Sequence, residues 1–207
     1  MDEYDLLVDN LKGSEATIYI FGSYVKGSYI RGASDIDVLI FTEDSMNVLR
    51  NILSIDPIKR LRLDVSIYYP GMTGSPRLRA FLATKYGELI SGERIELDLS
   101  EETVISLSRI SASEELRKMF RLICSPIDLK EIIEELSDSL LTIALLYIIS
   151  RGYYDATKPE IIHYDDVLPK EIMSIVRKAY NVKYAYVTKK VHPIELLKAS
   201  EYIVKEF

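Results

Sequence analysis

Two aspartates, Asp35 and Asp37, stand one residue apart at the start of an apolar run. Side chains two residues apart on a strand point to the same face, where two ionised carboxylates repel each other. A bound cation would offset that repulsion, and carboxylate oxygens suit Mg²⁺. Asp64, within LRLDVSIYY, could add a third oxygen donor on the same face. The three aspartates predict a divalent metal site of the kind that clamps a phosphoryl group during in-line displacement.

Gly22 and Ser23 lie upstream of the aspartates, directly after the apolar run IYIF. Glycine lets the backbone approach a phosphate, and N–H groups at the start of a helix bind anions. Lys26 could neutralise phosphate charge. These residues predict a triphosphate-binding turn beside the metal site. Taken singly, each candidate also fits a turn, a helix cap or a solvated strand end, so the functional reading depends on their combination.

Short strands must position these side chains. Runs rich in Ile and Val, bounded by Gly and Ser, are typical of buried strands. In the third such segment Leu, Val and Ile alternate with polar residues, and Asp64 falls on the polar face. The pattern predicts strands over 18–21, 36–41 and 61–69, and helices over 23–30, 44–53 and 77–90.

The second half of the chain has mostly helical spacing. Residues 93–100 could form a last strand or an extended linker. Ser111 with Glu114 fits a capping box, and Asp128 is a suitable cap for a long helix that ends at Arg151. The run 140–149 is apolar on nearly every face, which predicts burial all round, either as the central helix of a bundle or in a homodimer interface. We favour the central helix. Further helices are expected to open at Pro169 and Pro193.

The stretch FGSYVKGSYIRGASDIDVLIF resembles the signature of the DNA polymerase β-like nucleotidyltransferases. That signature is Gly-Ser, a short spacer, Asp-x-Asp, and a later acidic residue within a strand. Minimal and antibiotic nucleotidyltransferases share it, and the resemblance covers about residues 14–93. It implies an α/β (α+β) catalytic domain with a small mixed sheet over 1–99. An all-α helical bundle over 100–207, binding substrate or a partner, would follow.

The resemblance also implies roles for the residues. Asp35 and Asp37 would hold both metals, and Asp64 would hold the catalytic metal and help to deprotonate the attacking hydroxyl. Ser23 beside Gly22 would bind the β- and γ-phosphates, with Lys26 as a secondary contact. The expected cofactor is Mg²⁺ or Mn²⁺, and the expected donor is an NTP, with ATP favoured. NMP would pass to a hydroxyl on a small molecule, an RNA end or a protein side chain, releasing pyrophosphate.

Two other functions remain open from the sequence. One is a nucleotide-binding antitoxin or partner subunit with a helical interaction domain. The other is a helical-domain ribonuclease that resembles the HEPN group, in which four to six residues separate an arginine from a following histidine. The chain has two histidines, His163 and His192, and neither has an arginine at that spacing; Lys158 precedes His163 instead. The complete set of three aspartates favours the enzyme over the partner subunit, and the missing arginine–histidine pair counts against the ribonuclease.

Composition limits the remaining function classes. A formal net charge of -6 argues against broad, nonspecific nucleic-acid binding. The single cysteine, Cys124, excludes an intrachain disulfide and predicts a reducing, cytoplasmic compartment. The acidic start MDEYDLLVDN lacks the features of a signal peptide. The longest apolar run is shorter than the roughly 20 residues that span a bilayer, so no membrane association is expected.

Overall fold

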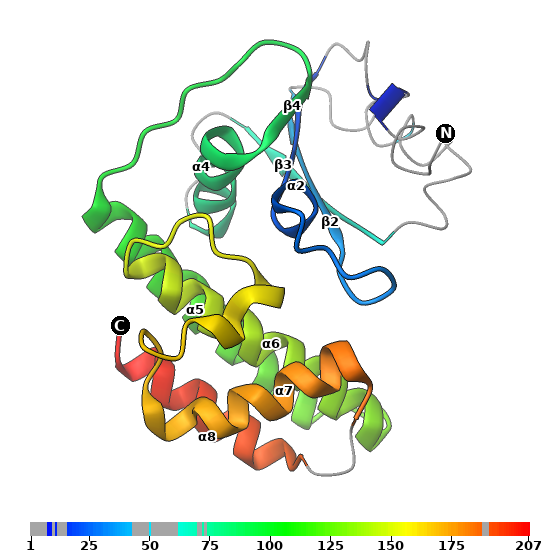
Figure 1. Ribbon diagram of the computed structural model, residues 1–207, viewed down its shortest axis with the longest axis vertical. Helices are drawn as coiled ribbons and strands as arrows, with labels where there is room; N and C mark the ends of the chain where they lie inside the picture. The colour runs from blue at the N-terminus through cyan, green and yellow to red at the C-terminus, as the bar shows by residue number, and fades with distance from the viewer. Residues whose placement is uncertain are drawn as a thin grey trace. The chain divides into compact units, whose positions relative to one another are not determined.

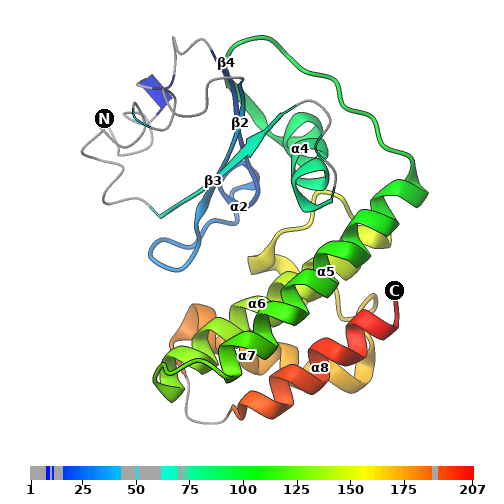
Figure 2. The same cartoon turned by 180° about the vertical axis from the view of Figure 1, so that it is seen from behind.

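The computed structural model describes residues 8–9, 11, 16–42, 50, 62–69, 72, 74–187 and 191–207. By its internal contacts the chain divides into two compact units, Met1–Leu99 and Ser100–Phe207. Figures 1 and 2 show both units, and each unit has its own hydrophobic core. The helix expected over 44–53 lies outside the described residues.

The first unit is built on a four-stranded mixed sheet with the order β3-β2-β1-β4. Strand β1 runs antiparallel to both of its neighbours, whereas β2 and β3 are parallel. This arrangement confirms the small mixed sheet that the family resemblance implies. The strands are β1 (Thr17–Phe21), β2 (Ile36–Phe41), β3 (Leu63–Tyr68) and β4 (Glu88–Ser91).

The two faces of this sheet have different coverings. Alternation along β1 and β2 sends one set of side chains into a core made largely of Ile and Val. The other set, which includes Tyr19, Phe21 and Leu39, packs with Ala80 and Ala83 of helix α4 (Ser75–Tyr86). Figure 1 shows α4 beside the strands. Odd-numbered residues of β1 and β2 therefore face α4.

Glycines end two helices earlier than the sequence pattern predicts. Helix α2 spans only Ser23–Lys26, because Gly27 adopts a left-handed conformation (φ 77°) and its N–H donates to Tyr24 O at 3.1 Å. Helix α4 stops before Gly87, and the next residues form β4 rather than more helix. The predictions of helix over 23–30 and 77–90 were therefore too long.

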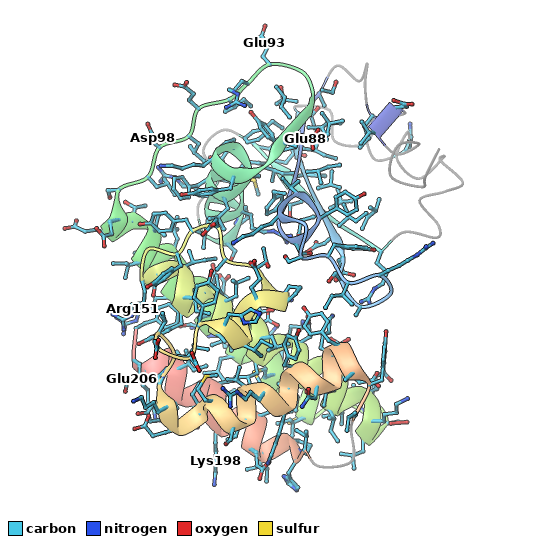
Figure 3. The ribbon with its side chains drawn as sticks, viewed as in Figure 1. Glu88, Glu93, Asp98, Arg151, Lys198 and Glu206 are labelled. Carbon is cyan, nitrogen blue, oxygen red and sulfur yellow. The ribbon has the colours of Figure 1, made fainter. Side chains whose placement is uncertain are left out.

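Residues 93–100 form an extended connector without helix or strand (Figure 3, which labels Asp98). Its first part is attached to β1: Ile95 N–H donates to the hydroxyl of Tyr19 at 2.8 Å, and Glu93 N–H donates to Thr17 Oγ1 at 3.2 Å. Of the two alternatives left open by the sequence, the structure shows the linker.

The second unit is a helical bundle arranged around α6. This helix contacts α5, α7 and α8, and its Leu140, Ile143 and Ile148 are fully buried. The prediction that 140–149 belongs to the central helix is confirmed. None of the described helices is long and apolar enough to cross a membrane. The elements are α5 (Glu101–Ile123), α6 (Leu129–Ser150), η2 (Lys158–His163), η3 (Lys170–Ile172), α7 (Met173–Ala185) and α8 (Pro193–Lys205).

Two predicted helix caps have different outcomes. Asp128 caps α6 by accepting hydrogen bonds from the N–H groups of Lys130 and Glu131, as predicted. Ser111 is not a cap, because it lies inside α5 and its hydroxyl donates to Leu107 O at 2.8 Å. The cap of α5 is Ser100, whose Oγ accepts from Thr103 N–H at 3.3 Å. The prediction at Ser111 was wrong because a capping-box spacing also occurs within a continuous helix.

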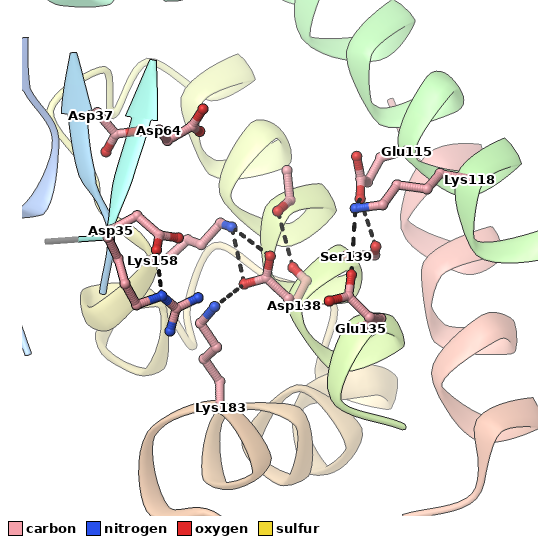
Figure 4. A network of polar contacts seen from close by, with 12 residues as sticks. Asp35, Asp37, Asp64, Glu115, Lys118, Glu135, Asp138, Ser139, Lys158 and Lys183 are labelled. Carbon is pink, nitrogen blue, oxygen red and sulfur yellow. Dashed lines mark hydrogen bonds and ion pairs between the residues drawn. The ribbon is translucent and has the colours of Figure 1, made fainter. Parts of the chain in front are cut away.

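A charged cluster inside the helical unit joins three of its elements (Figure 4). Asp138 of α6 lies 3.1 Å from Lys158 Nζ of η2 and 2.9 Å from Lys183 Nζ of α7. Burial alone would raise the pKa of Asp138, but the charges and hydrogen bonds of the two lysines outweigh it and hold that pKa far below its usual range. Asp138 therefore stays ionised and neutralises two partly buried lysines.

Asp138→Asn is expected to destabilise the helical unit by about 2–4 kcal/mol, because it leaves Lys158 and Lys183 close together without a counter-charge. Asp165→Asn is the matched control, since Asp165 is half exposed and lies 3.6 Å from Arg177. That change should cost less than about 1 kcal/mol. Urea unfolding followed by far-UV circular dichroism measures both.

The effect of Asp138→Asn should also depend on pH. The pKa of Asp138 is lowered in the folded protein, so its stabilising contribution is complete above the unfolded value of about 3.9 and is lost as the pH falls toward the folded pKa. The difference between the parent protein and Asp138→Asn should be constant near neutral pH and shrink below about pH 4. A difference unchanged down to pH 2 would contradict the ion-pair explanation.

Candidate active site

The carboxylates of Asp37 and Asp64 lie side by side on one face of the sheet. Each is the second residue of its strand, and the parallel register of β2 and β3 places them directly opposite each other. Paired strands are only about 4.8 Å apart, so these two charges are forced close together. Figure 4 shows the two side chains on neighbouring strands. The burial of Ile36 and Val38 on the opposite face fixes this orientation.

Arg79 of α4 supplies a positive charge between the two carboxylates. Its Nη2 donates to Asp37 Oδ1 at 2.8 Å and to Asp64 Oδ2 at 2.7 Å. Its guanidinium carbon lies 5.7 Å from the ring centre of Phe21. Burial alone would lower the pKa of Arg79, but the hydrogen bonds and charges of Asp64 and Asp37 outweigh it and raise the pKa. The arginine is therefore a permanent cation at this position.

Asp35 is engaged in a separate ion pair. Its Oδ1 lies 2.9 Å from Arg62 Nε, and Arg62 Nη1 also donates to Gly32 O at 3.3 Å. Asp35 precedes β2 and Arg62 precedes β3, so both stand at the same end of the parallel pair. Of the three predicted metal ligands, the structure brings Asp37 and Asp64 together and places Asp35 against an arginine.

The carboxylates of Asp37 and Asp64 fit a divalent cation. Both contact a single nitrogen of Arg79, so two anionic oxygens already converge on one positive charge. Mg²⁺ is commonly held by one or two protein carboxylates together with substrate phosphates. Within the described ranges, no group of three or more His, Cys, Asp or Glu side chains is arranged to hold a metal ion. Asp35, the third predicted ligand, contacts Arg62 through its Oδ1.

Gly22 provides the space that Asp37 occupies. It follows Phe21, the partner of Asp37 in the antiparallel β1–β2 register. Its φ of 74° and ψ of -147° define a backbone conformation that is essentially limited to glycine. A Cβ added at Gly22 would collide with the Asp37 carboxylate. The sequence predicted that Gly22 makes room for a phosphate; the structure adds a direct reason, the position of the aspartate.

Ser23 and Lys26 occupy the single turn that follows Gly22. Ser23 is buried, and its carbonyl accepts from Ser28 N–H at 3.0 Å, which closes the turn. Lys26 is the last residue of α2 and is exposed. Because α2 has only four residues, its dipole is small. Any phosphate affinity here must come from the N–H groups of the turn and from the two side chains.

Sequence reasoning missed Arg79 and Arg62. Arg62 could have been found, because it alternates with Asp64 on the polar face of the predicted strand and precedes it by two residues. Arg79 gives no such signal. It lies in a helix far along the chain from Asp37, and only the packing of α4 on the sheet brings the two together.

The two histidines have different surroundings in the helical unit. His192 caps α8, because its Nδ1 accepts from Ile194 N–H at 3.2 Å. His163 is exposed at the end of η2, and Lys158 forms an ion pair with Asp138. These placements give structural roles to His192 and Lys158, and they do not favour the ribonuclease alternative.

Comparison with protein families gives a match that covers the whole candidate site. Residues 6–118 match the family described as nucleotidyltransferase domain, which is more than half of the 207 residues. The match contains all six predicted site residues together with Arg62 and Arg79, and it ends within α5. No curated protein matches the chain. The family match confirms the resemblance to the polymerase β-like nucleotidyltransferases, and the chain belongs to the nucleotidyltransferase domain family.

Proposed function

We propose that the chain is a metal-dependent enzyme that transfers NMP from an NTP, with ATP as the expected donor, to an acceptor hydroxyl. The chain has a nucleotidyltransferase domain, and one geometric observation in that domain supports the proposal. The β2–β3 register sets Asp37 opposite Asp64, and a single nitrogen of Arg79 contacts both. A pair of convergent carboxylates suits the divalent ion that assists phosphoryl transfer.

Asp37 and Asp64 are the residues that would hold Mg²⁺ or Mn²⁺, and Asp35 is the third candidate ligand. The bound ion would neutralise charge that develops on the transferred phosphoryl group. The turn that begins at Gly22 lies against Asp37. The N–H groups of such a turn would bind the β- and γ-phosphates. Ser23 and Lys26 would add a hydroxyl donor and a positive charge.

At the α-phosphorus the reaction forms one bond and breaks one bond, and one proton is transferred. The acceptor oxygen attacks the α-phosphorus, and the bond from that phosphorus to the bridging oxygen of the β-phosphate breaks. Pyrophosphate leaves with the electron pair. The hydroxyl proton passes to Asp64, whose side chain is about half exposed and can therefore meet an incoming acceptor. Positioning and charge neutralisation supply most of the rate enhancement in this chemistry.

Incubation with each α-labelled NTP, Mn²⁺ or Mg²⁺, and a cell extract tests the proposal. We expect label to move from one NTP, with ATP the leading candidate, to an acceptor, with one pyrophosphate released per transfer. The acceptor class follows from which enzyme digests the labelled product: protease for a protein, ribonuclease for an RNA, and neither for a small molecule. Nucleotide binding without transfer to any fraction would contradict the enzyme and favour the antitoxin or partner-subunit alternative.

Ser23→Ala should weaken NTP binding by about 1–2 kcal/mol, the contribution of a hydrogen bond to a charged phosphate. The backbone of the turn should survive, because Ser28 N–H bonds to the carbonyl of residue 23 and not to its side chain. Calorimetry with a nonhydrolysable NTP measures the change, and Ser113→Ala on α5 is the control for the substitution itself. Equal affinity in the parent protein and Ser23→Ala would remove Ser23 from the phosphate site.

A further inference from the structure

The Asp37 and Asp64 carboxylates already bind a cationic side chain of the same protein, the guanidinium of Arg79. Nη2 of Arg79 lies 2.8 Å from Asp37 Oδ1 and 2.7 Å from Asp64 Oδ2, so it is positioned between the two carboxylates. Both distances are typical of charge-assisted hydrogen bonds. The guanidinium also lies over the ring of Phe21. Arg79 thus contacts both carboxylates and an aromatic ring, and its nitrogen lies between the carboxylates that would hold a metal.

This arrangement is partly open to water. The side chain of Arg79 is 32% exposed, that of Asp37 is 27% exposed and that of Asp64 is 47% exposed. Ion pairs with this exposure are screened by water and contribute little to stability. A divalent ion attracts the same carboxylates with twice the charge. The contacts of Arg79 are therefore strong enough to order the pair and weak enough to be exchanged.

We propose that Arg79 is an internal counter-cation for Asp37 and Asp64, and that a divalent metal ion must displace it to bind. This inference rests on the proposed function, because it assigns the metal of that reaction to the place that Arg79 holds. It gives Arg79 two effects: it stabilises the metal-free protein, and it lowers metal affinity by competition. Arg79 is on this basis a positioning residue for the carboxylates and not a ligand of the metal.

Thermal unfolding of the full chain in EDTA tests the first effect. Arg79→Met should lower the Tm by about 3 °C, because two neighbouring carboxylates lose their common partner. Adding Asp64→Asn to Arg79→Met should recover part of that loss, because it removes one of the two repelling charges. Arg79→Gln, which keeps an amide donor, replaces Arg79→Met if the latter fails to fold. An unchanged Tm in Arg79→Met, or a further decrease on adding Asp64→Asn, would overturn the counter-cation role.

Calorimetric titration of the full chain with Mn²⁺, without nucleotide, tests the second effect. Arg79→Met should bind Mn²⁺ about tenfold more tightly than the parent protein, a change of ~1.4 kcal/mol. Lys85→Met is the matched control, because Lys85 is an exposed cation of the same helix whose Nζ lies over the ring of Phe81. That variant should bind Mn²⁺ like the parent protein. Weaker or equal Mn²⁺ binding in Arg79→Met, or no Mn²⁺ binding in either protein, would overturn the competition.

The two proposals can fail separately. If the parent protein transfers NMP but Arg79→Met gains no Mn²⁺ affinity, the competition by Arg79 is wrong and the enzyme assignment stands. If no NTP is transferred but Arg79→Met binds Mn²⁺ more tightly, the exchange of cations stands and the enzyme assignment is wrong. Tm and Mn²⁺ affinity are both measured without turnover, so neither result depends on knowing the acceptor.

Discussion

Asp37→Asn is expected to lower nucleotidyl transfer by roughly 10³-fold or more, the scale seen when one member of a cooperating catalytic set is removed. Asp37 stands opposite Asp64, and the two share one cation, so an amide at position 37 removes one of the carboxylate charges that would hold the metal. Initial rates with labelled NTP at saturating Mg²⁺ measure the loss. Asp98→Asn, the same substitution at an exposed residue of the connector, should retain the full rate.

Asp37→Asn should also change stability, and Arg79 decides the direction. Two adjacent aspartates considered alone would repel, so removing one charge would stabilise the metal-free protein. In the structure Arg79 bridges the two carboxylates, and the substitution weakens that ion pair instead. We expect a decrease of about 1 kcal/mol at most, or about 2–4 °C in Tm, in EDTA. Near-parent transfer by Asp37→Asn would remove this aspartate from the active site, whatever its effect on stability.

The sequence was most informative where local signals agree. β2 was predicted with its observed bounds because an apolar run of the right length is preceded by Gly, Ser and Asp. The strand that carries Asp64 followed from strict alternation. These two local patterns placed the aspartates on strands and on one face. The cross-strand register that sets Asp37 opposite Asp64 depends on tertiary pairing, and no local pattern specifies it.

The features that the sequence did not predict correctly share one physical cause. They depend on tertiary contacts or on neighbouring helix boundaries, which a local residue pattern does not specify. Arg79 meets Asp37 only because α4 packs across the sheet, and the spacing of residues in the chain carries no record of that contact. Ser111 has the residue types of a helix cap, but helix α5 had already begun at Glu101. Likewise Gly27 and Gly87 ended helices whose periodic patterns continued beyond them. Whether a residue caps or ends a helix depends on where that helix begins, and the residue type alone does not specify the beginning.

Gly22→Ala is expected to have the second large effect, because it combines backbone strain with a collision. The backbone at Gly22 (φ 74°, ψ -147°) costs a non-glycine residue about 1–3 kcal/mol. The new methyl group would also meet the Asp37 carboxylate and push it from its place opposite Asp64. Transfer should fall by roughly 10²-fold or more, since a small misplacement of a catalytic group is enough for such a loss.

Gly74→Ala separates the two causes. Gly74 precedes α4 as Gly22 precedes α2, and its φ of 74° and ψ of -149° match those of Gly22 closely. A Cβ at Gly74 meets nothing within 4 Å. Both variants should therefore lose stability from strain in urea unfolding, Gly22→Ala more than Gly74→Ala because of the added collision, but only Gly22→Ala should lose transfer and bind Mn²⁺ more weakly. If both variants lost transfer equally, strain alone would explain the requirement for glycine, and the contact between Gly22 and Asp37 would have no part in organising the site.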